Sequence, residues 1–182
     1  MIFFILISFY LGFDFKENLL PYQYFIEFQK KTFIYGIGGN FNWHRSSDIV
    51  REFLFNLKIG FEKGSPLKDF NNHWVFLLIP GHTYKFSWSR YYSYADQKYY
   101  DSKKYVHTLY INFVSGISAS FLIKNLDLKI RIASPFLEFY YYNELSLKIS
   151  DKEIKEKERW ESFFLYSRLL RGPLIISLLI KI

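Results

Sequence analysis

The chain of 182 residues contains no cysteine. This absence excludes a disulfide framework and a thiolate metal site, and it is compatible with an oxidising compartment. The chain also lacks an apolar run of the roughly 20 residues that a membrane-spanning helix needs. The longest run, residues 2–13, is too short and is interrupted by Ser8. These absences argue against a helical membrane protein.

A clustered basic segment is also missing, although the formal net charge is +7. Lysine and arginine are scattered among apolar segments and loops, whereas a nucleic-acid-binding protein usually gathers them in a patch. We therefore expect no nucleic-acid partner. No composition change or linker divides the chain, which predicts a single domain.

Alternation of apolar and polar residues is the strongest positive feature. In residues 53–62, Phe53, Phe55, Leu57, Ile59 and Phe61 alternate with Asn56, Lys58, Gly60 and Glu62. Successive side chains of a strand point to opposite faces, so this segment predicts a strand with one apolar and one polar face. The pattern recurs along the chain and predicts an all-β, antiparallel, up-and-down barrel.

Eight strands account for the pattern, and ten result if two proline sites are hairpins. The eight predicted strands are 22–28, 33–43, 49–62, 73–79, 84–94, 105–123, 128–147 and 163–182. Short turns are expected at 44–48, 80–83 and 124–127, and longer loops at 63–72, 95–104 and 150–161. The apolar parity changes near 133–135 and again near 171–173, which predicts β-bulges. We prefer eight strands because ten would put the charged loop 150–161 on the side of the short turns.

The N-terminal segment 1–13 is similar to the apolar core of a secretory signal peptide, although it lacks a positively charged start. An additional strand is the alternative. We assign 1–13 as signal-like and 14–182 as the barrel domain.

The sizes of the two faces predict the orientation of the barrel. The apolar face carries mostly large aromatic and aliphatic residues, whereas the polar face is rich in Gly, Ser and Asn. An eight-stranded interior has little room, so the small and polar side chains are expected inside and the large apolar ones in lipid. A soluble lipocalin-like barrel or β-sandwich would have the opposite orientation. Aromatic residues expected at the membrane interfaces are Trp43, Trp74, Tyr92, Tyr94, Tyr105 and Trp160.

On these features the chain resembles small bacterial outer-membrane β-barrel proteins as a class, over residues 20–182. The resemblance implies an outer-membrane location, contact with outer-membrane lipid, and a C-terminal strand, 174–182, that the barrel-assembly machinery recognises. That strand usually ends in an aromatic residue in this class, whereas Ile182 ends it here. We expect a monomer.

If the polar face lines a lumen, nine charged residues point into it: Glu52, Lys58, Glu62, Lys85, Lys129, Arg131, Glu138, Glu144 and Lys148. They could form a conducting or proton-relay path. We favour a closed network of internal ion pairs, because an eight-stranded interior is just wide enough for its side chains.

The four histidines, His44, His73, His82 and His107, do not have the spacing of a zinc site, and we expect no metal or cofactor. His44 and Ser46 are two residues apart, as in a base and nucleophile on one strand face, but we predict a turn there. Leu109 stands where His107 would need a serine. We therefore expect no catalytic residues and a structural, adhesion or loop-mediated role. A lipid-A-modifying barrel enzyme and a soluble carrier of an apolar ligand are the alternatives.

Overall fold

The computed structural model describes residues 7–15, 21–45, 49–64, 72–167 and 174–182. These residues form nine strands in one antiparallel sheet, which confirms the all-β prediction. The strands are β1 (Ile7–Phe15), β2 (Pro21–Lys30), β3 (Phe33–Arg45), β4 (Ile49–Lys63), β5 (Asn72–Ser93), β6 (Lys98–Ile123), β7 (Leu126–Ser150), β8 (Glu153–Ser167) and β9 (Ile175–Lys181). Within the described part of the chain, no helix is long and apolar enough to cross a membrane.

The sheet closes in a ring of eight strands. Strands β1 to β7 pair in sequence order, and β9 joins β1 to β7. At the junction Phe13 lies opposite Leu178, and the Ile182 amide donates a 3.0 Å hydrogen bond to the Phe9 carbonyl. The first and last strands are therefore neighbours, although they lie at opposite ends of the sequence.

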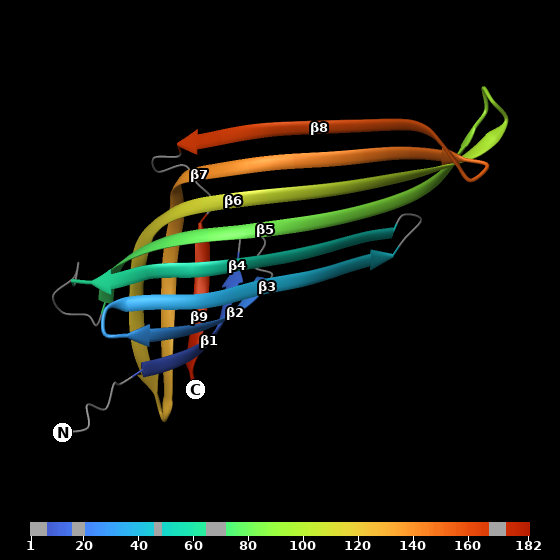
Figure 1. Ribbon diagram of the computed structural model, residues 1–182. Coiled ribbons are helices and arrows are strands. Elements are labelled where there is room, and N and C mark those ends of the chain that lie inside the picture. Colours follow the sequence, from blue (N-terminus) through green and yellow to red (C-terminus); the bar gives the residue numbers. More distant parts are fainter. Residues whose placement is uncertain (1–6, 16–20, 46–48, 65–71, 168–173) are drawn as a thin grey trace, which may run out of the picture.

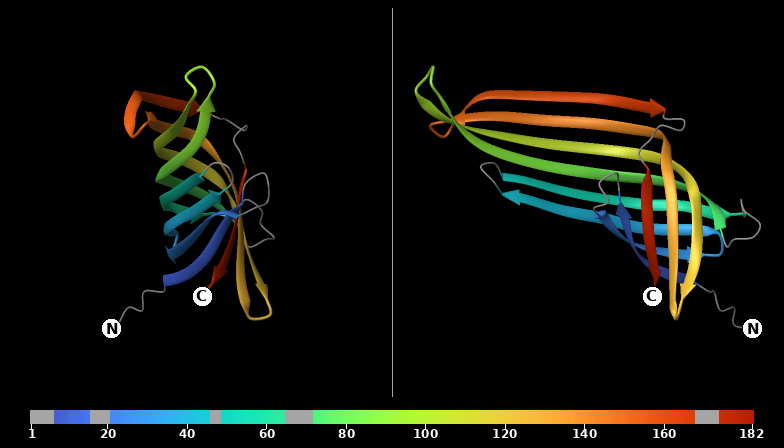
Figure 2. Two further views of the ribbon diagram at one scale, coloured as in Figure 1. Left: turned by 90° about the vertical axis from the view of Figure 1, so that its right-hand side faces the viewer. Right: turned by 180° about the vertical axis from the view of Figure 1, so that it is seen from behind.

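Strand β7 is shared between two partners. Its residues 128–133 pair with β9, whereas residues 137–150 pair with β8. Among the described residues, β8 pairs with β7 alone, so its other edge is free. We call the part of the sheet beyond the ring the wall; it contains β8 and the ends of β3 to β7 beside it. Figures 1 and 2 show the wall projecting from the ring, with the hairpins 94–97 and 151–152 at its far, or distal, end.

A β-bulge separates the two halves of β7, as predicted from the change of parity. Phe113 and Val114 of β6 lie opposite Leu137 and Pro135, so Phe136 is the extra residue. A bulge bends the strand that carries it and tolerates a proline, which has no N–H to donate. Strands β6 and β7 curve strongly between ring and wall in Figure 1.

The turn predicted at 80–83 is wrong, because β5 continues through Pro80 and Gly81. Both residues pair with β6, opposite Ile111 and Tyr110. On the β4 side, the register is interrupted beside Pro80 and resumes at Gly81. A proline removes one ladder hydrogen bond, and the long pairing with β6 compensates for it.

The loops predicted at 95–104 and 150–161 are also too long. Strand β6 begins at Lys98, and β8 begins at Glu153. Asp151 and Lys152 both have positive φ, 54° and 67°, as in the two-residue type I′ turn that favours hairpins. The charged segment that follows pairs with β7, and Lys148 contacts Glu156 at 3.0 Å. The highly charged sequence is therefore a strand that pairs with β7 along its length, with one cross-strand ion pair.

The ring contains eight strands as predicted, but three of the predicted strand assignments are wrong. Residues 73–94 are one strand instead of two, and residues 7–15 add β1. The predicted last strand, 163–182, contains parts of two strands, β8 and β9, and only β9 belongs to the ring. Because β5 is unbroken, the turns at 31–32 and 124–125 share one end of the sheet, and 94–97 and 151–152 share the other. The predicted division into short and long connections on opposite sides is therefore wrong. The predicted second bulge at 171–173 lies outside the described residues.

Candidate functional site inside the ring

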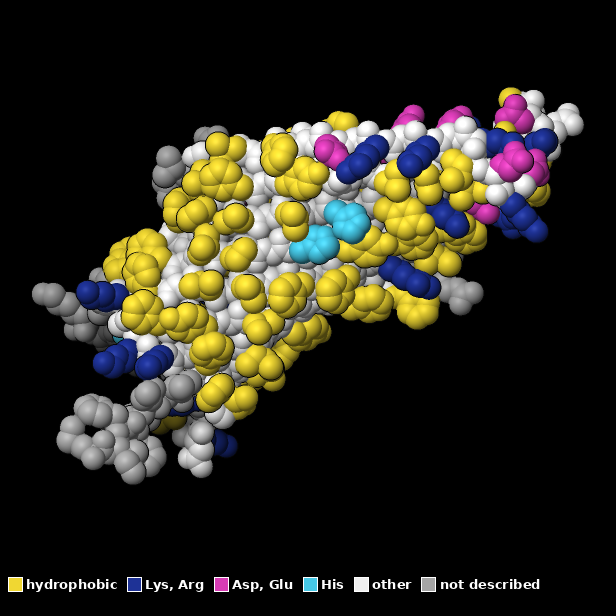
Figure 3. Space-filling model, viewed as in Figure 1, with side chains coloured by type: hydrophobic (Ala, Val, Ile, Leu, Met, Phe, Trp, Pro, Cys, Tyr) yellow, Lys and Arg dark blue, Asp and Glu magenta, His cyan; other side chains and the backbone are white. Residues whose placement is uncertain are grey.

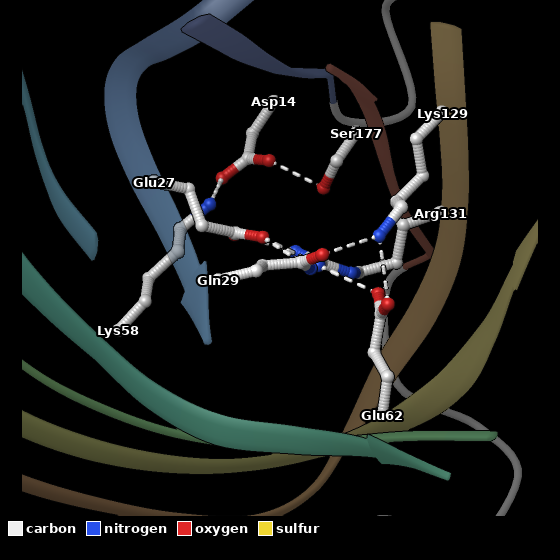
Figure 4. Close-up of polar contacts among 8 residues, drawn as sticks. All are labelled: Asp14, Glu27, Gln29, Lys58, Glu62, Lys129, Arg131 and Ser177. Carbon is white, nitrogen blue, oxygen red and sulfur yellow. Dashed lines mark hydrogen bonds and ion pairs between the residues drawn. The ribbon is translucent and has the colours of Figure 1, made fainter. Parts of the chain in front are cut away.

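The interior of the ring is lined by polar side chains that alternate with outward apolar ones. On β4, Asn56, Lys58 and Glu62 are buried, whereas Phe55 and Phe61 are exposed. Six charged residues and four polar ones form what we call the interior network: Asp14, Glu27, Lys58, Glu62, Lys129 and Arg131, with Gln23, Gln29, Asn56 and Ser177. Figure 4 shows eight of them converging from β1, β2, β4, β7 and β9.

Arg131 is the centre of one half of the interior network. Its Nη1 and Nη2 donate to the two carboxylate oxygens of Glu27, each at 2.9 Å, and Nη2 also donates to Glu62 at 3.1 Å. The side chains of Arg131 and Glu27 are almost completely inaccessible to solvent. Planar, two-point pairing is the strongest geometry available to a guanidinium and a carboxylate.

Lys129 extends this half of the network toward the end of the ring that carries the turns at 31–32 and 124–125. Its Nζ donates to Glu62 and to Gln29, each at 2.7 Å, and Gln29 donates to Glu27 at 3.1 Å. Its ammonium also lies 4.9 Å from the ring centre of Tyr10. Glu62 thus joins two cations of β7 to β4 across the interior.

Asp14 organises the second half. It accepts hydrogen bonds from Lys58 at 2.6 Å, from Ser177 at 2.5 Å, and from Gln23. Asn56 donates to Gln23 at 2.5 Å and to the Tyr110 hydroxyl at 3.3 Å. Lys58 also lies 3.2 Å above the ring of Phe25, a cation–π contact. Asp14 therefore connects β1 with β2, β4 and β9 at the ring junction.

The charges of the interior network balance. Three carboxylates, Asp14, Glu27 and Glu62, face three cations, Lys58, Lys129 and Arg131. A buried charge is tolerated when it is paired and hydrogen-bonded, and each of these six has such a partner. The arrangement connects five strands across the interior of the ring.

Four of the nine predicted lumen residues belong to the interior network, and five lie on the wall. Lys58, Glu62, Lys129 and Arg131 are in the network. Glu52, Lys85, Glu138, Glu144 and Lys148 share the corresponding face of the wall. Glu138 accepts from the Tyr140 hydroxyl at 2.7 Å, and Glu144 pairs with Lys104 at 2.7 Å. Strand parity placed all nine residues on one face of the sheet. It could not show that five of them lie on the wall, beyond the end of the ring.

The six predicted interface aromatics are spread over four places. Trp74 lies near the turn end of the ring, and Trp43 and Tyr105 lie on the outer face near the wall. Tyr92 and Tyr94 form an edge-to-face pair at the distal end. Trp160 lies opposite Glu144 and contacts Tyr142 at a centroid distance of 5.0 Å, so it is on the inner face. A single outward girdle therefore does not include Trp160.

The predicted lumen residues do not include two of the six charged members of the interior network, Glu27 and Asp14, or its four uncharged polar members. Glu27 and Gln23 stand on the polar parity of the predicted strand 22–28, so parity could have identified them. Asp14 directly follows the segment assigned as signal-like, and only the pairing of β1 with β9 places it beside Ser177. Ser177 likewise occupies a polar position between apolar ones in the last strand.

The described histidine side chains lie outside the interior network. His82 and His107 stack on the outer face, with His82 Nε2 3.2 Å from His107 Nδ1, and His107 also packs against Tyr84. In the described part of the chain, no group of three or more His, Asp or Glu side chains could hold a metal ion. Comparison with protein-family models, curated proteins and solved structures finds no significant match for this chain.

Proposed function

We propose that the protein is an integral outer-membrane β-barrel that acts structurally, or through the projecting wall as an adhesion or interaction module. The observation that carries this proposal is the outer surface of the ring. Large apolar side chains such as Phe53, Phe55, Ile59 and Phe61 are 41–49% exposed there. A soluble protein rarely exposes so continuous an apolar surface.

The height of the uncharged outer band fits a bilayer. On β4, Arg51 and Lys63 flank five outward apolar residues, the alternate positions from Phe53 to Phe61. From Arg51 to Lys63 the strand is about 40 Å long at about 3.3 Å per residue, and a strand tilt of about 40° leaves about 30 Å between the two charges along the axis. The hydrocarbon core of a bilayer is about 30 Å thick.

The positions of the basic residues support the same proposal. In the space-filling view, hydrophobic side chains cover much of the face shown, two histidines lie near its middle, and lysine and arginine side chains lie mostly toward its ends and edges (Figure 3). At the distal boundary Arg51 lies 5.4 Å from the Trp43 ring centre. Cations and aromatic side chains at such boundaries are typical of membrane interfaces.

A soluble carrier is disfavoured by the interior. A carrier of an apolar ligand needs an apolar cavity inside its barrel. Here buried charged and polar side chains line much of the ring interior, although Val75, Leu77 and Val114 form an apolar cluster on one side of the ring.

A lipid-modifying enzyme has less support than a structural role. A catalytic histidine needs a nucleophile within hydrogen-bonding distance. The contacts of His107 are with His82 and Tyr84, and its strand neighbour on the same face is Leu109. Mass spectrometry of lipid A from cells with and without the protein separates the two roles; a modified species that disappears with His107→Ala would favour the enzyme.

Membrane insertion is tested by refolding the full chain into phosphatidylcholine vesicles and floating them on a density gradient. The protein should float, resist extraction with carbonate, and migrate differently on gels with and without boiling. A chain that stays in the soluble fraction in cells and does not float with vesicles would contradict the proposal.

A further inference from the structure

The outer face of the wall carries two grooves that lie end to end on β6, β7 and β8. The first has a volume of about 570 Å³ and is lined by Leu109, Ile111, Phe139, Phe163 and Leu165, among others. The second has a volume of about 580 Å³ and is lined by Tyr105, Leu145, Lys157 and Arg159, among others. One groove is apolar, and the other carries two cations.

Strand register shows that the grooves are continuous. Along β8 the residues Lys157, Arg159, Phe163 and Leu165 follow one another at outward positions, interrupted only by Glu161. Along β7, Phe139 of the apolar groove is followed on the same face by Asn143 and Leu145 of the cationic one. An elongated molecule with an apolar and a polar end could therefore occupy both.

The charges of the second groove favour an anion. Lys157 makes no ion pair with a described residue, and Arg159 pairs with Glu161 at 2.5 Å while its side chain remains 64% exposed. Glu161 also accepts a 3.2 Å hydrogen bond from Asn143. Lys103 lies opposite Leu147 on the same face, which leaves the groove positive despite this carboxylate.

We propose that these grooves bind one anionic membrane lipid, with its phosphate between Lys157 and Arg159 and an acyl chain along the apolar groove. The inference rests on the proposed membrane function, because the groove faces lipid only if the ring is inserted. Interfacial lysine and arginine attract anionic headgroups, and Tyr105 with Trp88 would lie at the headgroup level.

The test uses the full chain in phosphatidylcholine vesicles that contain a trace of spin-labelled phosphatidylglycerol or, separately, spin-labelled phosphatidylcholine. The wild-type protein should immobilise phosphatidylglycerol severalfold more than phosphatidylcholine. Replacing Lys157 or Arg159 with Gln should lower this preference by up to about fivefold for each cation removed. Lys155→Gln is the matched control, since Lys155 is engaged by Glu153 at 2.6 Å and lies outside the groove.

Two further measurements identify the ligand. Leu109→Trp fills the apolar groove and should reduce immobilisation without changing the charge. Inorganic phosphate should not displace the labelled lipid, because it lacks the acyl chain; displacement at low concentration would indicate a free-phosphate site instead. Equal immobilisation of both lipids, or equal loss in the control, would overturn the inference. A protein that floats with vesicles but shows no preference keeps the proposed function, whereas one that does not float loses both.

Discussion

Arg131 on β7 and Glu27 on β2 form a two-point ion pair across the ring, with both nitrogen to oxygen distances at 2.9 Å. The two residues are 104 positions apart in sequence and almost fully buried. Strands β2 and β7 are not neighbours in the sheet, so this contact connects them across the interior of the ring. We infer that it helps to hold the ring closed.

Replacing Arg131 with Met should destabilise the protein strongly, because Glu27 would remain buried without its cation. Breaking a buried pair typically costs about 3–5 kcal/mol. Urea unfolding of the vesicle-inserted protein, followed by tryptophan fluorescence, measures the change. The double variant Glu27→Met with Arg131→Met should recover part of the loss, since neither charge remains. Unchanged unfolding of the single variant would show that the pair contributes little.

A disulfide introduced between β1 and β9 should form and test the closure of the ring. Phe13 and Leu178 lie opposite each other, and paired Cα atoms in antiparallel strands are about 4.5–5.5 Å apart. Disulfide geometry accepts this separation. The natural chain has no cysteine, so the pair F13C/L178C is the only thiol pair present. Oxidation should give a faster-migrating band on non-reducing gels, whereas F9C/L178C should not; equal crosslinking of both would contradict the register.

The interior network should prevent steady ion conduction. Its three carboxylates are paired with three cations, and the side chains of Arg131 and Lys58 are nearly inaccessible to solvent. In a planar bilayer the wild-type protein should show no stable open state. Arg131→Ala removes a large side chain and one charge, and it should produce brief openings if the chain still inserts. A stable wild-type pore of nanosiemens conductance would contradict this expectation.

The distal hairpin should respond to acid through Asp151. The Lys98 ammonium, 3.1 Å away, lowers the pKa of this carboxyl below its ordinary value. A lowered carboxyl pKa means that the pairing contributes fully above the unfolded-state pKa of about 4 and is lost as the pH falls through the folded-state pKa. An NMR titration should find a higher Asp151 pKa in Lys98→Gln than in the wild type. Lys152→Gln serves as the control, and an unchanged pKa in Lys98→Gln would exclude the pairing.

The bulge in β7 is a feature that the local sequence pattern predicts correctly. Parity changed near Pro135, and the structure inserts Phe136 there. The Pro80–Gly81 pair carries an equally strong local turn signal, yet β5 passes through it. The difference arises because long pairing with β6 outweighs the loss of one hydrogen bond, and such pairing involves residues far away in the sequence.

The candidate site also combines features that follow from the local sequence with features that depend on pairing between distant strands. The inward direction of Lys58, Glu62, Lys129 and Arg131 follows from strand parity alone. Their partners do not, because Glu27 and Asp14 are set by the register of β2 and β1 against distant strands. The loop predicted at 150–161 is wrong for the same reason, since the strand character of β8 from Glu153 onward depends on pairing with β7.

The sequence alone determined that the chain is all-β and antiparallel, and which residues share a face, because these properties follow from a two-residue period. Tertiary structure alone decided which strands close the ring, where Arg131 meets Glu27, and that β8 leaves a free edge. The physical reason is that period is a local property, whereas strand partners and register depend on pairings between segments up to the whole chain apart.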